Sequence, residues 1–336
     1  MTGNRTTIAG IVLAIGLIVS VTFAVTFGPA EIRVDEVWAS ILSHLGLGDS
    51  PLPVLRDGIV WELRLPRVLT AAAVGAGLAI SGAVMQAITR NPLADPYLLG
   101  LSSGASLGAV AVLLLGAAVV LPFAAFVGAM AALVTTMLLA SSLGTITPTR
   151  TVLAGLAVSS LASAITSLVI FWTVTGDSYR EILGWLLGSL AGARWSAVAI
   201  AFAAILIAGN PIAIGGRVLD AFAFGDTTAA SLGVDVAATR WVLLTASALP
   251  TGAMVSVSGS IGFVGLVLPH AVRLVVGPGH RALLPLSALT GAIFLIWADT
   301  AARTLFDPRE LPVGIVTAIV GAPVFALLLA RRRGAT

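Results

Sequence analysis

The sequence predicts an all-α protein that crosses a membrane about ten times. Of its 336 residues, 58% are hydrophobic and only 10% are charged, whereas roughly a quarter are charged in a soluble globular domain. The mean hydropathy is +1.06, and apolar runs long enough to cross a bilayer as helices recur along the chain. These observations predict one polytopic membrane domain over residues 1–336.

The first apolar run covers residues 8–27 and ends at Gly28-Pro29. A cleaved signal peptide is the alternative interpretation, but the run is long for a signal peptide and lacks a clean small-x-small cleavage site before Pro29. We therefore expect a retained helix. Residues 28–63 are mixed in composition and lean acidic, and we expect a loop there.

Nine further apolar runs follow, and a polar segment separates the sixth span from the seventh. The predicted spans are 68–88, 97–117, 120–142, 151–174, 195–214, 239–258, 261–276, 283–302 and 311–330. An even number of spans puts both termini on one side, and Arg5 with the arginines at 331–333 predicts that this side is the cytoplasm. With this orientation the inner segments hold ten arginines and four acidic residues, whereas the outer segments hold eight arginines and eleven acidic residues.

Two short stretches suggest an internal repeat. Ser81-Gly82 precedes Pro92 by the same step that separates Ser258-Gly259 from Pro269. The second predicted span runs inward and the seventh runs outward, so a true repeat is inverted, an arrangement common in transporters.

Residues 216–238 form the longest polar-bearing segment of the second half, and we call this segment the elbow. Gly225 and Gly233 divide it into two short helical pieces, the second starting at Asp226 or Thr227 as N-cap. Apolar residues at helical spacing predict one shared face on each piece and an exposed, partly apolar knuckle: Val218, Leu219 and Phe222, then Ala229 and Leu232. The elbow is either a docking site for another protein or a loop that joins two membrane halves.

Two absences from the composition exclude whole chemistries. The chain has no cysteine, which rules out a thiolate nucleophile, an iron–sulfur cluster, a cysteine zinc site and a disulfide. All 18 basic residues are arginine, so no P-loop lysine exists and a Walker-type ATPase cannot reside in this chain. Its three histidines are scattered, so we expect no metal site, and nothing suggests nucleic-acid binding.

The stretch from Gly100 to Gly104 matches the G-x-S-x-G pattern of serine hydrolases. An intramembrane protease needs Ser102 or Ser103 as nucleophile and a histidine on another span, for which His270 is available. The competing interpretation is a glycine stripe for close helix packing, because glycines recur every four residues from 100 to 108. We favour the packing interpretation.

Charged residues cluster near the outer ends of the predicted spans. Asp299 and Arg303 are four residues apart and can pair along a helix, and Arg64 and Arg67 flank Pro66. The three arginines form either a docking surface for an acidic partner or interfacial side chains that snorkel to water. No acidic residue falls in the middle of a predicted span, so an ion-coupled carrier is the less favoured alternative and we expect the energy source to lie elsewhere.

Several long motifs resemble the FecCD family. They are LRLPR at 63–67, AISGAVMQAITRNPLADPYLLGLSSGAS at 79–106, SGSIGFVGLVLPHAVRL at 258–274 and LPVGIVTAIVGAPVFALLL at 311–329. Members of this family are permease subunits of ATP-driven importers for iron–siderophores, haem and cobalamin. The resemblance runs from about residue 60 to the end of the chain.

The resemblance implies a multi-pass protein of the plasma membrane, with ten helices per subunit. It implies a homodimer or close heterodimer of permeases with the pathway at their interface, two cytoplasmic ABC ATPases and one external substrate-binding protein. No cofactor is expected in this chain, because ATP and Mg bind the partner ATPases. The cargo implied is an iron chelate: a siderophore complex, haem or cobalamin.

The resemblance also assigns residues. The elbow is similar to the coupling helices of the family, with candidate residues Leu219, Phe222, Gly225, Asp226, Ala229, Leu232 and Gly233. Arg64, Arg67 and Arg303 match arginines that grip acidic residues of the binding protein. Thr147, Pro148 and Thr149 resemble the turn of the inner gate, although Pro148 departs from its hydroxyl-rich pattern and Ser260 stands where many members have proline.

Overall fold

The structure is a computed structural model, and it describes residues 3–333 except 116, 118–119, 143, 174–177, 210–211, 213–214 and 307. Throughout these residues the regular secondary structure is helical, with no β-strand, which confirms the predicted all-α class. Parts of three predicted spans, at 116, at 174 and at 210–211 with 213–214, fall on positions outside the described residues.

In the described part of the chain, six helices are long and apolar enough to cross a membrane, and four shorter apolar helices accompany them. The long ones are α1 (Gly3–Thr26), the continuous helix of α3 (Val54–Gly58), η1 (Ile59–Arg64) and α4 (Leu65–Thr89), α6 (Leu121–Ser142), α7 (Pro148–Thr173), α13 (Val236–Ser258) and α15 (His280–Thr304). The shorter ones are α5 (Leu101–Leu114), α9 (Trp195–Ala204) with η4 (Ile205–Gly209), α14 (Val264–Val276) and α16 (Val313–Arg333). Each of the ten predicted ranges overlaps one of these helices.

Residues 28–63, predicted as a loop, are largely helical. They contain α2 (Val34–His44), and α3 and η1 extend α4 outward without a break. The α2 helix starts where the carboxylate of Glu36 accepts from the amide of Arg33 at 2.8 Å. Its last residue, His44, stacks on Trp61 with ring centroids 4.1 Å apart, which holds α2 against the extended helix. Two of the acidic residues that suggested a loop, Asp35 and Glu36, therefore lie in the first turn of a helix.

The central helix is α4, which is buried along most of its length. Glycine makes this position possible, because a Cβ on Gly75 would clash with the Gly291 carbonyl of α15 and a Cβ on Gly82 would clash with the Gly265 carbonyl of α14. Without side chains at these points the backbones approach closely, as in small-residue contacts between membrane helices. The close packing of α14 and α15 against α4 follows from these contacts.

Both halves contain a long helix followed by a break and a short helix. In the first half α4 leads through η2 (Pro96–Leu99) to α5, and in the second half α13 leads to α14. The two breaks touch, because the hydroxyl of Tyr97 donates to the carbonyl of Ile261 at 3.1 Å. The sequence pair that suggested the repeat does not mark equivalent places: Ser81-Gly82 lies inside α4, whereas Gly259 ends α13 in a left-handed conformation.

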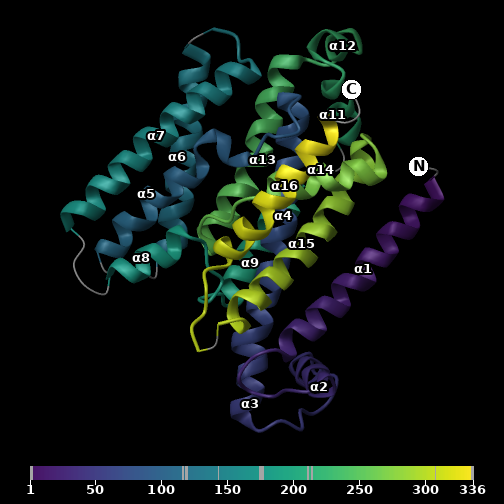
Figure 1. Ribbon diagram of the computed structural model, residues 1–336, viewed down its shortest axis with the longest axis vertical. Helices are drawn as coiled ribbons and strands as arrows, with labels where there is room; N and C mark the ends of the chain where they lie inside the picture. Colours follow the sequence, from purple (N-terminus) through teal and green to yellow (C-terminus); the bar gives the residue numbers. More distant parts are fainter. Residues whose placement is uncertain are drawn as a thin grey trace.

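The termini and the elbow lie toward the same end of the molecule. In Figure 1 the start of α1, the end of α16 and the two elbow helices lie in the upper part, while α2 and α3 lie at the bottom. The elbow helices are α11 (Gly216–Ala223) and α12 (Asp226–Ser231). Because the elbow shares an end with both termini, it lies on whichever side of the membrane holds them.

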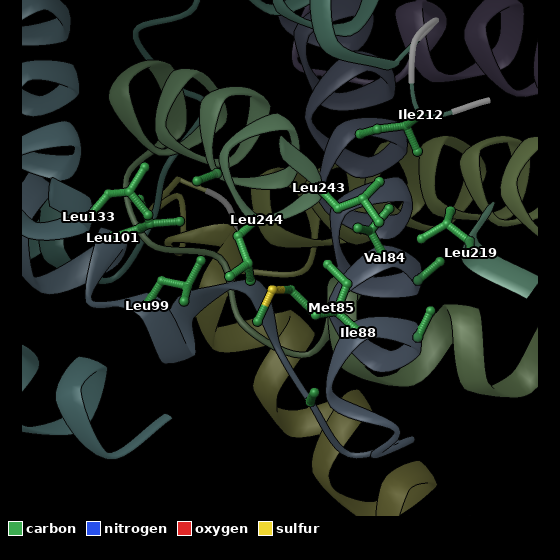
Figure 2. Packing of buried hydrophobic residues seen from close by; sticks show 14 of the residues in the cluster. Val84, Met85, Ile88, Leu99, Leu101, Leu133, Ile212, Leu219, Leu243 and Leu244 are labelled. Carbon is green, nitrogen blue, oxygen red and sulfur yellow. The ribbon is translucent and has the colours of Figure 1, made fainter. Parts of the chain in front are cut away.

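One of two buried apolar clusters joins the elbow to the membrane helices. Figure 2 shows Leu219 of α11 facing Val84 of α4, and the same cluster includes Ile88 of α4 and Leu243 of α13. The same cluster reaches Leu99 and Leu101 at the break before α5. The elbow is therefore part of the packed domain, because apolar side chains of α11 leave water on folding.

Candidate functional site

The elbow folds as two short helices with a sharp turn between them. Gly225 makes this turn at φ +108°, a conformation that side-chain-bearing residues rarely adopt, and it is the N-cap of α12. The prediction of Asp226 or Thr227 as N-cap is therefore wrong: Asp226 is the first helical residue, and its carboxylate binds an arginine instead of capping the helix. Gly233, at φ +83°, follows the end of α12 as predicted.

The predicted docking face of the elbow points inward. Leu219, Phe222 and Ala229 are buried, so these three side chains fix the elbow to the membrane helices and are unavailable to a partner. The exposed apolar side chains are Phe224 and Leu232, with 77% and 67% of their surface accessible. Leu232 was among the predicted residues and Phe224 was missed, although its position two residues after Phe222 places it off the inward face of the helix.

Both acidic side chains of α11 and α12 bind buried basic residues of long helices. Asp220 accepts from the backbone amide of His280 at 2.9 Å and lies 2.7 Å from Nδ1 of its ring. Asp226 accepts from Nη2 of Arg240, on α13, at 2.7 Å. The elbow is thus attached at one point to α15 and at another to α13.

The predicted inner-gate residues form the start of α7. Thr147 precedes the helix, and its carbonyl accepts from the amide and hydroxyl of Thr151 at 3.0 and 2.9 Å. Pro148 is the first residue of α7, where its missing N–H costs nothing. Thr149 is exposed. Pro148 therefore departs from the hydroxyl-rich pattern at a position where proline favours the start of a helix.

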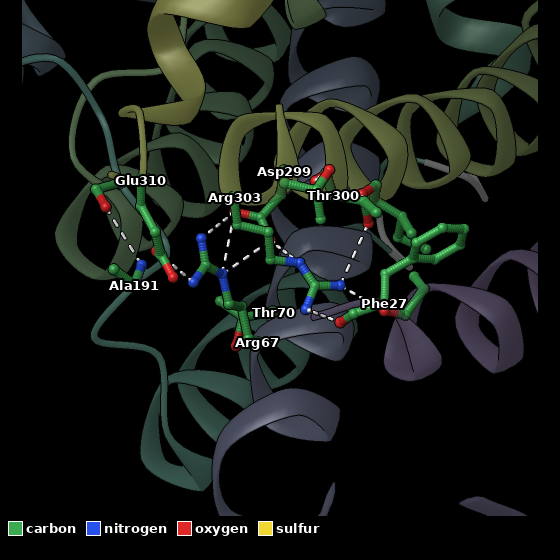
Figure 3. A network of polar contacts seen from close by, with 12 residues as sticks. Phe27, Arg67, Thr70, Ala191, Asp299, Thr300, Arg303 and Glu310 are labelled. Atoms are coloured by element: carbon green, nitrogen blue, oxygen red, sulfur yellow. Dashed lines mark hydrogen bonds and ion pairs between the residues drawn. The ribbon is translucent and has the colours of Figure 1, made fainter. Parts of the chain in front are cut away.

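The three outer arginines bind partners within the chain. Arg64 donates to the carbonyls of Val25, Thr26 and Ala30 at 2.7–3.1 Å, which holds the end of α1 against α4. Arg303 donates to the carbonyls of Ala24 and Phe27 (Figure 3). The outer arginines are therefore not free interfacial side chains, and their guanidinium groups fasten helices together.

Arg67 makes the strongest ion pair of this group. Its Nε and Nη2 atoms each lie 2.9 Å from the Asp299 carboxylate, and its Nη1 lies 2.7 Å from Glu310 (Figure 3). The predicted helical pair of Asp299 with Arg303 exists at 3.9 Å, too long for a hydrogen bond. The main partner of Asp299 is therefore Arg67 on α4, which spacing within one helix did not reveal.

Two hollows open near these helices. One, of about 370 Å³, is lined by Arg64, Arg67, Arg303 and Glu310 together with the 28–30 turn. The other, of about 450 Å³, lies among α5, α6, α8 (Ser178–Leu186), α9 and α13, with Arg180, Glu181 and Arg194 in its lining. Arg180 and Arg194 were not predicted as site residues, because no motif surrounds them.

The serines of the G-x-S-x-G match bond to other serines. The hydroxyls of Ser102 and Ser260 lie 2.7 Å apart, and the hydroxyl of Ser163 donates to that of Ser103 at 3.2 Å. A Cβ on Gly104 or Gly108 would clash with a carbonyl of α6, so these two glycines support close packing as expected, whereas Gly100 precedes α5 in a left-handed conformation. This geometry provides packing and hydrogen bonding in place of an activated nucleophile.

Asp95 caps the short helix in the first break. Its carboxylate accepts from the amide of Tyr97 at 2.8 Å, ahead of Pro96 at the first helical position. Loss of hydration raises the pKa of the Asp95 carboxyl to about 6, and the bond from Tyr97 opposes this shift. In the described part of the chain, no group of three or more histidine, aspartate or glutamate side chains has the arrangement of a metal site.

Comparisons with known proteins agree with this architecture. The model of the FecCD transport family matches residues 16–331. The chain is 41% identical to the cobalamin import system permease protein BtuC of Halobacterium salinarum, over 96% of this chain and 95% of that protein. It is 43% identical to the Fe(3+) dicitrate transport system permease protein FecD of Escherichia coli, over 88% and 91%.

A solved structure has the same fold along nearly the whole chain. It is a metal-chelate type ABC transporter in an inward-facing conformation, with a TM-score of 0.84 and 30% identity, covering 96% of this chain and 98% of that one. The family model and the two relatives each cover far more than half of the chain. The chain therefore belongs to the FecCD transport family.

Proposed function

We propose that this chain is the membrane-spanning permease of an importer driven by separate ATPase subunits, and that the elbow is where they act. The elbow carries this proposal: it exposes Phe224 and Leu232 at the end of the molecule that holds both termini, while its buried residues attach it to α4, α13 and α15. An exposed apolar pair on a fixed support suits docking into a groove of a partner. The chain has no lysine and so no P-loop lysine, which supports a nucleotide site on the partner.

The proposed cargo is an iron chelate or cobalamin. The similar permeases named above carry the names of cobalamin and Fe(3+) dicitrate systems, and a further relative, 42% identical over 82% of this chain, is the hemin transport system permease protein HmuU of Yersinia pestis. Most of the charged side chains near the outer ends of the spans bind partners inside the chain. We propose that an external binding protein selects the cargo and that the pathway forms between two copies of the chain.

The roles of the outer arginines and of the inner turn are part of this proposal. Arg64, Arg67 and Arg303 line one outer hollow with Glu310, so a binding protein that docks there meets residues whose positions depend on this network. Thr147 precedes α7 and Pro148 and Thr149 begin it, at the end of the molecule that holds the elbow. We propose that this turn opens and closes the inner end of the pathway.

Reconstitution tests the proposal. The permease is purified with its candidate ATPase, incorporated into vesicles with the binding protein outside, and supplied with radiolabelled iron chelate or cobalamin. We expect uptake only when ATP reaches the ATPase subunits, and no loss of uptake when an ionophore collapses the ion gradients. Uptake that follows the membrane potential and ignores ATP would show an ion-coupled carrier and overturn the proposal.

A further inference from the structure

Arg240 connects three separate parts of the inner end. It lies on α13 with only 3% of its surface exposed. Its Nη2 donates to Asp226 of α12 at 2.7 Å, and its Nη1 donates to the carbonyl of Ile146 at 2.8 Å. Its guanidinium carbon also lies 5.6 Å from the centre of the Phe222 ring of α11, within the range of a cation–π contact. One buried side chain therefore touches both elbow helices and the turn that precedes α7.

Stability alone is a poor reason for a buried charge at this position. Removing a guanidinium from water is costly, and a well-packed apolar residue often holds helices together equally well. A planar guanidinium does what an apolar side chain cannot, because its separate N–H groups bind two acceptors in fixed directions. The acceptors here lie on different segments: Asp226 belongs to the elbow, and Ile146 lies two residues before the first residue of α7.

The partners of Arg240 also differ in exposure. The Arg240 side chain is 4% exposed, whereas that of Asp226 is 38% exposed, so the pair lies at the boundary between the domain and the solvated elbow. A movement of α12 changes the Asp226–Arg240 distance directly. Because the same guanidinium holds the Ile146 carbonyl, the start of α7 responds to that change.

We propose that Arg240 is the positioning residue that transmits movement of the elbow to the turn before α7. This inference rests on the proposed function, since it assumes that an ATPase moves the elbow and that residues 147–149 form the inner gate. When α12 shifts, the bond from Asp226 re-orients the Arg240 guanidinium, and the carbonyl of Ile146 moves with it. Arg240 binds no cargo and no nucleotide in this scheme.

The second attachment of the elbow supplies a matched control. Asp220 binds His280 at the start of α15, and this contact does not include Ile146. Asp220→Asn and Asp226→Asn make the same chemical change on neighbouring elbow helices. Only Asp226→Asn removes charge from the Asp226–Arg240–Ile146 contact that leads to α7. A general weakening of the elbow therefore affects both variants, whereas a loss of transmission affects Asp226→Asn alone.

The first experiment measures ATP hydrolysis and cargo uptake in the same vesicles, with the complete complex of permease, ATPase and binding protein. We expect Asp226→Asn and Arg240→Gln to hydrolyse ATP at near the wild-type rate while the cargo imported per ATP falls about tenfold, because each variant replaces a hydrogen bond between two charged groups by a weaker one in which only one partner is charged. Arg240→Lys, which keeps the charge but not the two-pronged geometry, should be intermediate. Asp220→Asn and the exposed Arg217→Gln should keep the wild-type ratio.

The second experiment follows the movement itself and does not depend on uptake. The chain has no native cysteine, so spin labels can be placed at pairs of exposed sites without further changes. One pair, Thr227→Cys with Arg281→Cys, reports the elbow, and the other, Thr149→Cys with Arg281→Cys, reports the start of α7. We expect ATP to change both distances in the wild-type complex, and only the elbow distance in the Asp226→Asn and Arg240→Gln complexes.

The outcomes separate the two proposals. A wild-type complex that imports nothing with ATP contradicts the proposed function itself. A wild-type complex that imports, with Asp226→Asn and Arg240→Gln complexes that keep the normal ratio and move both label pairs, overturns the inference about Arg240 alone. If Arg240→Gln fails to assemble, Asp226→Asn decides the question, because its side chain is partly exposed and keeps an acceptor oxygen.

Discussion

Arg67 and Asp299 form an ion pair between α4 and α15 that is almost completely removed from water. Their side chains are 10% and 2% exposed, and two hydrogen bonds of 2.9 Å join them. A carboxylate buried in this way depends on its partner, because the surrounding helices cannot replace its hydration. At the scale of single residues, the outer arginines therefore stabilise the packing of the helices that they join.

Removing Arg67 should destabilise the protein strongly. Arg67→Leu leaves the Asp299 carboxylate buried without its main partner, and we expect a loss of about 3 to 5 kcal/mol, seen as a lower melting temperature in detergent. Arg67→Leu combined with Asp299→Leu should recover much of this loss. Arg33→Leu, at a side chain that is 79% exposed, is the control and should change little. An unchanged melting temperature in Arg67→Leu would contradict the structural role of Arg67. Because the variant is expected to be less stable, assays of binding-protein docking must compare equal amounts of folded protein.

The protein should remain stable when position 95 loses its charge but not when it loses the oxygen that accepts from the Tyr97 amide. Asp95→Asn keeps an acceptor for the Tyr97 amide, whereas Asp95→Ala removes it and should cost about 1 kcal/mol. The raised pKa, about 6, means that the folded protein binds a proton more tightly than the unfolded chain. The wild-type melting temperature, relative to that of Asp95→Asn, should therefore rise as the pH falls from 7 to 5. A difference that does not depend on pH would refute the shifted pKa.

At the scale of elements, close helix packing depends on where glycine lies. Gly75 and Gly82 of α4 each face a carbonyl of a neighbouring helix, so any side chain there pushes the helices apart. Gly184 and Gly192 have open space where a Cβ would stand. The chain has 36 glycines, and those that contact another backbone determine how α4 packs.

Substitution of these glycines should have unequal effects. Gly82→Val forces α4 away from α14, and we expect a loss of at least about 1 to 3 kcal/mol together with a low yield of folded protein. Gly192→Val, in open space, should fold normally. Monodispersity in size-exclusion chromatography and the melting temperature check both variants, and equal behaviour of the two would contradict the packing argument.

The elbow should separate into anchoring and docking residues. Leu219→Ala removes a buried side chain and should cost about 2 to 5 kcal/mol. Phe224→Ser and Leu232→Ser change exposed side chains, so they should leave the melting temperature unchanged and weaken ATPase binding by at least about tenfold. Co-purification of the ATPase measures the second effect. Full ATPase binding by both serine variants would place the docking surface elsewhere.

At the scale of the whole molecule, the arrangement of the two ends sets the topology. The elbow lies toward the same end as both termini, and α2 lies at the opposite end (Figure 1). Arg5, the arginines at 331–333 and the acidic residues between α1 and α4 predict that the elbow lies in the cytoplasm and α2 outside.

Single cysteines introduced into the cysteine-free chain should report this topology. A membrane-impermeant maleimide added to intact cells or spheroplasts should label Asp49→Cys, in the exposed stretch after α2, and should not label Thr227→Cys in the elbow. After permeabilisation both should react. Labelling of Thr227→Cys in intact cells would show that the elbow lies outside the cell, where it could not contact cytoplasmic ATPases.

Much of the architecture follows from the sequence alone. A backbone inside a bilayer has to satisfy its own hydrogen bonds, so each long apolar run is expected to be a helix, and every predicted range does overlap an apolar helix. Composition likewise excludes an internal ATPase and cysteine chemistry, because the residues that such sites need are missing. Within the glycine stripe, Gly104 and Gly108 lie four residues apart on α5, so spacing alone puts both on one helix face and predicts their close packing.

The tertiary structure decided which side chains meet. Asp299 prefers Arg67, which is 232 residues away, to Arg303 on its own helix, because α4 and α15 approach through Gly75 and Gly291. Helical spacing identified the apolar faces of the elbow but not their direction, and packing against α4 turned Leu219 and Phe222 inward. The contact of Arg240 with both Asp226 and Ile146 likewise depends on three segments converging. Local spacing determines which side chains share one face of a helix. Only the packing of the helices determines which residues of other helices those side chains contact.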